Sequence, residues 1–460
     1  MGVSRITRGL TRGGKMKKSR HGSKLRYGTA LLVVAALGLT ACGDDDDSSS
    51  SDTTAAGTDD TTAPATGNLA EALGYTDNLL GDVSCNFGAV LALTGPGSFY
   101  GKTMSRGTDL AIEMIKEAGG PSFSVEYWDH KSGDPAAGVT AMTEIIAKGI
   151  TIKLASYIDD LGAMLPQTAS GKVFTLDGGG GTSVFGQGQP YFWGTRAITP
   201  NDTLSGVYEW FKATYPDKTK VGLIGWDLGE ALNEVIKADF LAQTEAAGLE
   251  FNGLYELSAV GATDYAQSIS KIKANQPDLL LVGIYGQDPG AFANQAETAN
   301  LTAVLVGSEF TPDGVNASKG TWEKGWTFAY DYFDIGTAVS PVASLFAERF
   351  NEAYGEDPDF YAANFFENTI RFWELMREAS ASGATNDQLC VGDTLENALQ
   401  ADLTMVSLYG GDETTNGSST QDAETRSVKE RPMGVFTYEN GTVTNLASFG
   451  IGGADFKLAD

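Results

Sequence analysis

The chain has 460 residues, of which 42% are hydrophobic and 20% are charged, which is enough for a globular body of two domains. Its net charge is −27, but the first 41 residues hold nine of the 32 basic side chains and no acid, so the remainder carries 23 basic and 59 acidic groups, a net charge of −36. So acidic a body repels phosphate backbones and argues against nucleic acid as a partner. The two histidines, His21 and His130, are too few for a histidine-based metal site or a serine–histidine triad, and no metal is expected.

Residues 1–41 have the composition of an export signal peptide. Met1–Arg26 is rich in Arg and Lys, and the apolar run Thr29–Thr40 is too short for a comfortable membrane span. The run ends in Leu-Thr-Ala-Cys-Gly, which resembles the lipobox of bacterial lipoproteins, in which the cysteine, here Cys42, receives a diacylglyceryl group and becomes the mature N-terminus. An uncleaved signal anchor is the alternative, and translation from Met16 would give a leader of more usual length.

Residues 42–82 are predicted to form a disordered tether. The acids Asp44–Asp47 are followed by Ser, Thr, Ala and Gly to about Gly67, with almost nothing apolar to bury. A calcium site at the acids is less favoured than a solvated charge run, because hard cations need ligands held in a folded loop.

Strands and helices alternate from Cys85 onward. Strands are expected at Phe87–Leu93, Phe123–Trp128, Ile152–Tyr157, Val173–Leu176, Val221–Gly225, Leu279–Tyr285 and Thr302–Val306. Helices are expected at Met104–Ala118, Pro135–Lys148, Asp202–Tyr215, Glu230–Ala247 and Asp264–Ala274. The alternation predicts an α/β fold of mostly parallel sheets with helices on both faces, and the two series on either side of about Ile198 indicate two lobes. The polar stretch Tyr409–Pro432 is interpreted as a long surface loop.

No catalytic motif is complete in the sequence. Gly178–Gly181 is not followed by the Lys-Ser/Thr of a phosphate-binding loop. Ser268–Lys271 has the Ser-x-x-Lys spacing of penicillin-binding proteins, but the partner motifs of those enzymes are absent. His130 is interpreted as a structural turn residue. We therefore expect a protein that is not an enzyme and has no cofactor.

Aromatic, acidic and glycine-rich residues stand at the ends of several expected strands. They are Tyr100 after the first strand, Tyr157, Asp159 and Asp160 at and after the third, Gly179, Gly180 and Thr182 after the fourth, and Trp226, Tyr285 and Glu309 in the second series. Taken singly, each is more often a turn or surface residue. Because ligands bind at the carboxyl ends of parallel strands, together they predict a cleft for a small polar ligand.

The opening of the expected body resembles a known protein family. Phe87–Gly120 is similar to the start of the leucine/isoleucine/valine-binding proteins, which have the type I periplasmic binding fold and feed ABC transporters. Further similarity lies at Tyr127–His130 with Asp134-Pro135, at Lys220–Gly225, at Asp264-Tyr265 through Gly283, at Val306–Glu309 and at Pro432–Phe436, so the likeness covers most of Asp82–Phe456. The resemblance implies two lobes joined by three hinge strands, with lobe one over 83–197 and 333–431 and lobe two over 198–332 and 432–460.

The resemblance also implies roles for single residues. In the family, hydroxyls and backbone amides hold the ligand carboxylate, an acid pairs with its ammonium group, and aromatic side chains cover the rest. The resemblance implies Thr182, Gly179 and Gly180 as the groups that hold the carboxylate and Glu309 as the partner of the ammonium group. It implies Tyr100 and Tyr285 as the aromatic cover, with Trp226 a looser match. The family's serine-rich turn is replaced here by Tyr157–Gly162, whose Asp159 and Asp160 would repel a ligand carboxylate unless they face away or meet a cation. The family roles imply an amino acid as the ligand, with branched-chain ones included. Because of Asp159 and Asp160, an amide, a diamine-like cation or an amino-acid derivative stays open.

The expected function is that of an extracytoplasmic, lipid-anchored solute-binding protein that closes on a small molecule and delivers it to the permease of an ABC importer. A ligand-sensing subunit of a membrane signalling receptor is the alternative, because the same fold serves both. The resemblance places Cys85 and Cys390 in one lobe. Outside the cytoplasm such a pair favours a disulfide over free thiols.

Overall fold

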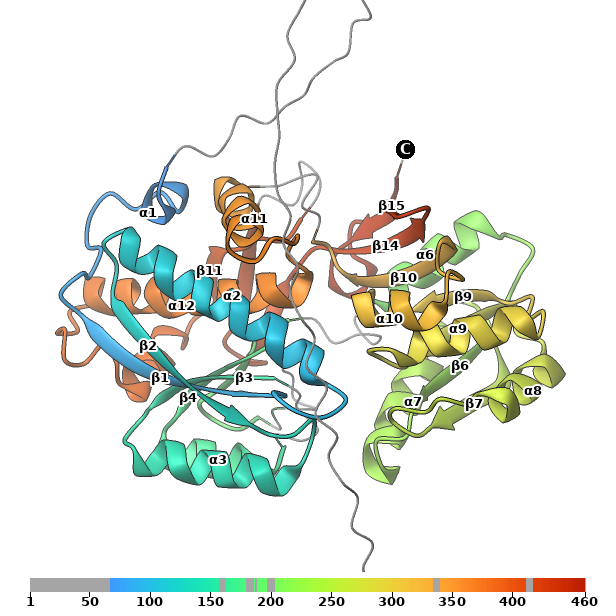
Figure 1. The fold of residues 1–460 in the computed structure, drawn as a ribbon, viewed down its shortest axis with the longest axis horizontal. Helices are drawn as coiled ribbons and strands as arrows, with labels where there is room; N and C mark the ends of the chain where they lie inside the picture. The colour runs from blue at the N-terminus through green and yellow to red at the C-terminus, as the bar shows by residue number, and fades with distance from the viewer. Residues whose placement is uncertain are drawn as a thin grey trace, which may run out of the picture. The chain divides into compact units, whose positions relative to one another are not determined.

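The computed structural model describes residues 67–156, 162–178, 186, 188–196, 203–333, 340–410 and 417–459 (Figure 1). The expected signal peptide, Cys42 and most of the expected tether lie outside these residues. Within the described ranges, no helix combines the length and the apolar composition that crossing a membrane requires.

The folded body begins earlier than the sequence predicted. Asn68 caps the short helix α1 (Leu69–Ala72), and Leu69 and Leu73 are buried in the main hydrophobic core. The prediction of a tether up to residue 82 is therefore wrong for 68–82. The reason is that the two leucines stand four residues apart and share one face of a helix, which gives this segment an apolar surface to bury.

The first sheet is parallel, with strand order β2-β1-β3-β4-β5. Its strands are β1 (Ser84–Leu91), β2 (Ser122–Asp129), β3 (Ile152–Ala155), β4 (Phe174–Asp177) and β5 (Phe192–Gly194). Phe87 of β1 faces the core formed with α2 (Ser98–Glu117) and α12 (Phe360–Ala381), whereas Val90 packs on the other face beneath α3 (Pro135–Ala147) (Figure 1). Burial on both faces explains why β1 is apolar along most of its length.

The second sheet has strand order β16-β15-β14-β10-β9-β8-β6-β7. Its strands are β6 (Lys220–Trp226), β7 (Glu250–Ser258), β8 (Leu279–Gly283), β9 (Val304–Gly307), β10 (Lys324–Asp331), β14 (Met433–Glu439), β15 (Thr442–Phe449) and β16 (Lys457–Leu458). Leu223 of β6 packs with α6 (Leu204–Thr214) and α7 (Glu230–Ala246), and Ile224 faces α8 (Ala266–Asn275) and α9 (Asp288–Thr298). The first five strands in this chain order run parallel, and β14 to β16 add antiparallel strands beside β10.

The remaining helical segments are α5 (Leu165–Gly171), α10 (Pro312–Ser318), α11 (Pro341–Tyr354), α13 (Gly392–Ala398), η1 (Gly162–Met164) and η3 (Ile451–Gly453). A third, antiparallel sheet consists of β11 (Leu403–Val406), β12 (Ser418–Asp422) and β13 (Ser427–Glu430). The predicted surface loop over 409–432 is therefore wrong in its second half. Its polar residues mislead because Gln421 is fully buried and donates to the carbonyl oxygen of Gly194 (2.9 Å), which ties this sheet to β5.

The chain passes between the first and second sheets at three places, after β5, after β10 and before β14. The oxygens of Asp331, at the end of β10, lie 2.8 Å from Arg196 Nε and 3.3 Å from Arg431 Nε. Arg431 Nη1 also donates to Glu367 (3.1 Å), and Glu367 pairs with Arg371 (2.6 Å). All five side chains are more than nine-tenths buried, and we call them the crossover cluster.

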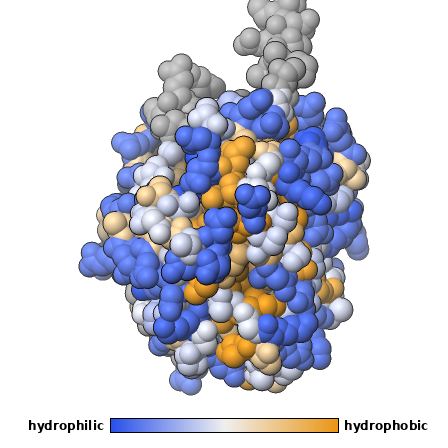
Figure 2. All heavy atoms as spheres, turned by 90° about the vertical axis from the view of Figure 1, so that its left-hand side faces the viewer, coloured by the Kyte–Doolittle hydropathy of each residue, from blue (hydrophilic) through white to orange (hydrophobic). Residues whose placement is uncertain are grey.

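The exposed surface is mainly hydrophilic on the face in Figure 2, with a narrow band of hydrophobic side chains running down it. The large hydrophobic residues with the greatest exposure stand on different elements or loops. They are Ile146, Val235, Val260, Val391, Val443 and Leu458. Some exposed apolar surface of this kind is normal for globular proteins.

The predicted disulfide between Cys85 and Cys390 is present, with 5.6 Å between the two Cα atoms. It joins β1 to the segment that precedes α13, and 305 positions separate the two cysteines in the sequence. A crosslink that closes so long a loop restricts the unfolded chain strongly.

Replacing both cysteines, Cys85→Ser with Cys390→Ser, is expected to lower the free energy of unfolding by about 2–4 kcal/mol. Urea unfolding of the oxidised protein measures the change, with Cys42→Ser as a control that leaves the disulfide intact. Coincident unfolding curves for the double variant and the wild type would show that the crosslink contributes nothing.

Candidate ligand-binding site

A cavity of about 450 Å³ lies where strands of the first and second sheets end. On the first sheet's side it is lined by Pro96, Gly97, Tyr100, Ser132, Gly133 and Pro135, and on the second sheet's side by Trp226, Asp227, Leu228, Val260, Gly261, Tyr285, Gly286, Gln287 and Asp288. These residues follow β1 and β2 in one sheet and β6, β7 and β8 in the other. Position and size are both those of a small-molecule site in an α/β protein.

Two predicted aromatic residues, Trp226 and Tyr285, form one wall of this cavity. Their ring centroids are 5.1 Å apart, in an edge-to-face arrangement. The indole N–H of Trp226 donates to Asp288 Oδ2 (2.8 Å), which also accepts from the backbone N–H of Gly261 (2.9 Å). Asp288 is buried, and burial raises the pKa of its carboxyl. This acid holds the Trp226 ring in place.

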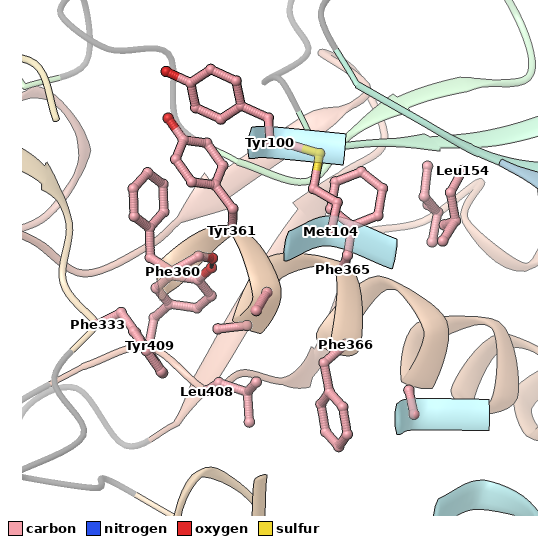
Figure 3. Close-up of a cluster of buried hydrophobic side chains, with 14 of the residues drawn as sticks. Tyr100, Met104, Leu154, Phe333, Phe360, Tyr361, Phe365, Phe366, Leu408 and Tyr409 are labelled. Carbon is pink, nitrogen blue, oxygen red and sulfur yellow. Dashed lines mark hydrogen bonds between the residues drawn. The ribbon is translucent and has the colours of Figure 1, made fainter. Parts of the chain in front are cut away.

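Glu309, predicted as a partner of a ligand ammonium group, does not line the cavity but lies behind Tyr100, which does. Its carboxylate accepts from Tyr100 Oη (2.8 and 3.0 Å to the two oxygens), from Tyr361 Oη (2.5 Å) and from the backbone N–H of Gly286. Figure 3 shows the hydroxyl groups of Tyr100 and Tyr361 on the same side of the aromatic cluster. Only 1% of Glu309 is exposed, and burial raises its pKa although the three donors oppose that shift.

Sequence reasoning missed Tyr361, Ser132 and Asp288. Asp288 stands three residues after Tyr285, so a search that extended three residues further beyond the strand end would have included it. Tyr361 gives no such signal, because it belongs to the first turn of α12 and meets Glu309 only through the tertiary fold.

The turn after β2 carries Ser132 to the cavity, and His130 holds this turn together. Ser132 Oγ accepts from the backbone N–H of Gly97 (2.8 Å) and donates to the carbonyl of Thr94 (2.6 Å), which fixes the turn against the one after β1. His130 Nδ1 accepts from the backbone N–H of Gly133 (3.1 Å), an arrangement that needs this nitrogen unprotonated. Its side chain is fully buried, and burial lowers its pKa to about 4.

The stability of the protein is expected to fall between pH 6.5 and about pH 4 because of His130. In this range the unfolded chain binds a proton at His130, whereas the folded protein keeps the imidazole neutral, so acid favours unfolding. The full difference is about 3 kcal/mol. We expect His130→Asn, which keeps an acceptor at the turn, to lose correspondingly less stability over this range in urea unfolding. Parallel pH profiles for the two proteins would contradict the assignment.

Six predicted site residues lie outside the described part of the chain. They are Tyr157, Asp159, Asp160, Gly179, Gly180 and Thr182. The segments that contain them begin just after Ala155 of β3 and Asp177 of β4, which pair with each other at the ends of adjacent strands. Of the predicted residues that are described, Tyr100, Trp226 and Tyr285 line the cavity and Glu309 contacts Tyr100. No cluster of three or more His, Cys, Asp or Glu side chains suited to a metal ion occurs among the described residues.

Comparison with known proteins gives a family match over most of the chain. The family model for periplasmic binding proteins matches residues 84–441. The Leu/Ile/Val-binding protein homolog 3 of Brucella melitensis is 23% identical over 259 residues, which is 52% of this chain and 64% of the relative. The alignment thus spans slightly less than two thirds of that relative's length.

Solved structures with the same fold include transport proteins of different specificity. The leucine-binding protein LivK of Thermotoga maritima is 16% identical with a TM-score of 0.64, and the match covers 79% of this chain and 98% of that one. A solute-binding protein of an ABC transporter from R. palustris in complex with benzoate is 18% identical with a TM-score of 0.64, covering 82% and 98%. These neighbours are two-lobed α/β proteins, and the predicted fold class is confirmed.

Proposed function

The chain belongs to the periplasmic binding protein family, and on that premise we propose that it is a lipid-anchored solute-binding protein that delivers a small polar ligand to an ABC importer. Proteins of this family bind solutes, are not enzymes and act outside the cytoplasm. The ligand we propose is an amino acid, branched-chain ones included, or an amino-acid derivative. The first sheet with its helices would form one lobe and the second sheet the other, with boundaries near residues 197, 332 and 431, where the chain crosses between them.

The observation that carries this proposal is the cavity of about 450 Å³, because residues from both sheets line it. A ligand held there contacts Tyr100 on one side and Trp226 on the other. Contacts that exist only when both sides are in place stabilise the closed arrangement relative to an open one. Binding would thereby produce the closed, loaded form that a permease recognises.

A thermal-shift screen of the full chain against amino acids, their amides and hydroxy analogues, polyamines, quaternary ammonium compounds and aromatic acids tests the proposal. A true ligand at a hundred times its dissociation constant stabilises the protein by about 2.7 kcal/mol, a shift that is easily measured. Mass spectrometry of the released compound should find it chemically unchanged. Absence of stabilisation by every class would contradict a solute-binding function, and turnover of the compound would indicate an enzyme instead.

The proposed lipid anchor depends on Cys42. When the protein is expressed in a bacterium that processes lipoproteins, Cys42→Ser is expected to move it from the membrane fraction to the soluble extracytoplasmic fraction, because the acyl chains that hold it at the membrane are lost. Fractionation and the intact mass of the mature protein measure the change. An unchanged distribution between membrane and soluble fractions would contradict lipidation.

A further inference from the structure

Three aromatic side chains surround the cavity, and the polar hydrogens of two of them are bonded to buried acids. Tyr100 donates to Glu309, and Trp226 donates to Asp288. Tyr285 packs edge to face against Trp226, and a Cβ atom on the adjacent Gly286 would lie 3.6 Å from Tyr100 Oη, so all three side chains belong to one enclosure. An O–H or N–H that donates to a carboxylate makes its ring richer in electrons, which strengthens the attraction of the ring face for a cation.

The charge around the cavity is negative. Asp227 and Asp288 line it, Glu309 stands directly behind Tyr100, and Lys and Arg are absent from its described lining. The charge of Arg196, a member of the crossover cluster, acts on Glu309 and opposes the rise in its pKa that burial causes. Arg196 is itself paired with Asp331. The electrostatic field in the cavity therefore favours a cationic ligand group over an anionic one.

The carboxylates at the cavity already accept several hydrogen bonds each. Glu309 accepts from three donors, of which two are the tyrosine hydroxyls. Asp288 accepts from Trp226 and Gly261. A primary ammonium group brings three N–H donors, and each one that stays unpaired in a buried site carries a free-energy cost. An alkylated ammonium group has no N–H to satisfy, and its charge is spread over methyl groups that pack on ring faces.

We propose that the cleft selects a quaternary ammonium compound, which the rings of Tyr100, Trp226 and Tyr285 enclose while the buried acids behind them supply negative charge. This proposal rests on the proposed function and narrows its ligand class to N-alkylated amino-acid derivatives and related cations. The aromatic rings contact the positive charge, and the carboxylates act through the rings that they hold.

Isothermal titration of the full chain with choline, ethanolamine and the neutral tert-butyl analogue of choline tests the proposal, with glycine betaine and leucine as further probes. Ethanolamine replaces the alkylated nitrogen by a primary one, and the tert-butyl analogue keeps the shape and removes the charge. We expect choline or glycine betaine to bind, and choline to bind about tenfold or more tightly than either of its two counterparts.

Trp226→Leu is expected to weaken binding of the quaternary compound about tenfold or more. The matched control is Trp128→Leu, because Trp128 also donates its indole N–H to a carboxylate, that of Glu144 (2.8 Å), but lies outside the cavity. Circular dichroism checks that both variants fold, and Tyr285→Leu replaces Trp226→Leu if the latter does not.

Equal affinity for choline and its neutral analogue, or an unaffected Trp226→Leu variant, would overturn the proposal. So would the absence of binding by both quaternary compounds. Binding of leucine without binding of the quaternary compounds would overturn this ligand class while supporting the proposed function. Failure of every compound in the wider screen would overturn both.

Discussion

Asp331→Ala is expected to lower the free energy of unfolding by about 3–5 kcal/mol, because it leaves two buried arginines without their shared acid. Asp331 is fully buried, and its oxygens lie 2.8 Å from Arg196 Nε and 3.3 Å from Arg431 Nε. The attraction between buried charges offsets the large cost of removing them from water, and breaking such a pair exposes that cost. The loss should exceed that of a typical core substitution, since two cations are affected by one change.

Urea unfolding compares this variant with Glu126→Ala, which removes the acid of an exposed pair with Lys148 and should leave the midpoint almost unchanged. Asp331→Asn keeps an acceptor for Arg196, so its loss of stability should lie between those of the Asp331→Ala and Glu126→Ala variants. A variant at Asp331 no less stable than the Glu126 variant would mean that water or neighbouring groups compensate both guanidinium groups.

The crossover cluster illustrates what the sequence does not reveal. Glu367 and Arg371 stand four residues apart, a spacing that is typical of an exposed ion pair on a helix. In α12 the pair is buried, because the helix is enclosed between the first sheet and the segments that cross to the second. Arg431, which also bonds to Glu367, is 60 residues further along the chain than Arg371. Only the tertiary fold brings these charges together.

Part of each large sheet could be predicted from the sequence, because buried parallel strands are short, apolar and separated by helices, but β5, β7, β10 and β14 to β16 were not predicted. β6 and β8 illustrate this, since each is buried on both faces and was predicted within two residues of its bounds. β12 was missed because its Ser, Thr and Gln side chains are buried by pairing with backbone groups and with β13, which a hydrophobicity pattern does not detect.

Residues of the candidate site could be predicted from the sequence where they stand at the end of a strand. Trp226 and Tyr285 stand at strand ends, and both line the cavity. Tyr361 could not be predicted in this way, because it lies in the first turn of a helix and contacts Glu309 from there. Glu309 was predicted from its place after a strand, and the resemblance implied its role. Its three donors come from separate parts of the chain that only the tertiary fold brings together.

Glu309→Ala is expected to lower the free energy of unfolding by about 3 kcal/mol, because it removes the acceptor of three donors, two of which are buried tyrosine hydroxyls. The donors are the hydroxyls of Tyr100 and Tyr361 and the backbone N–H of Gly286, which belong to different sheets and their helices. Loss of the carboxylate also removes the group that holds the Tyr100 ring at the cavity, so ligand binding should weaken together with stability.

A double-mutant cycle with Glu309→Ala and Tyr361→Phe measures how far this network acts as one unit. Tyr361→Phe removes one donor and leaves the ring in place, so the double variant should lose less stability than the sum of the two single changes. Groups that share one hydrogen-bond network couple by about 0.5–3 kcal/mol. Tyr127→Phe is the matched control, because Tyr127 donates to Asp109 (2.6 Å) away from the cavity and should be additive with Glu309→Ala. Additivity at Tyr361 as well would show that the 2.5 Å contact with Glu309 contributes no coupling across the cleft, and Glu309 would then act on the ligand alone.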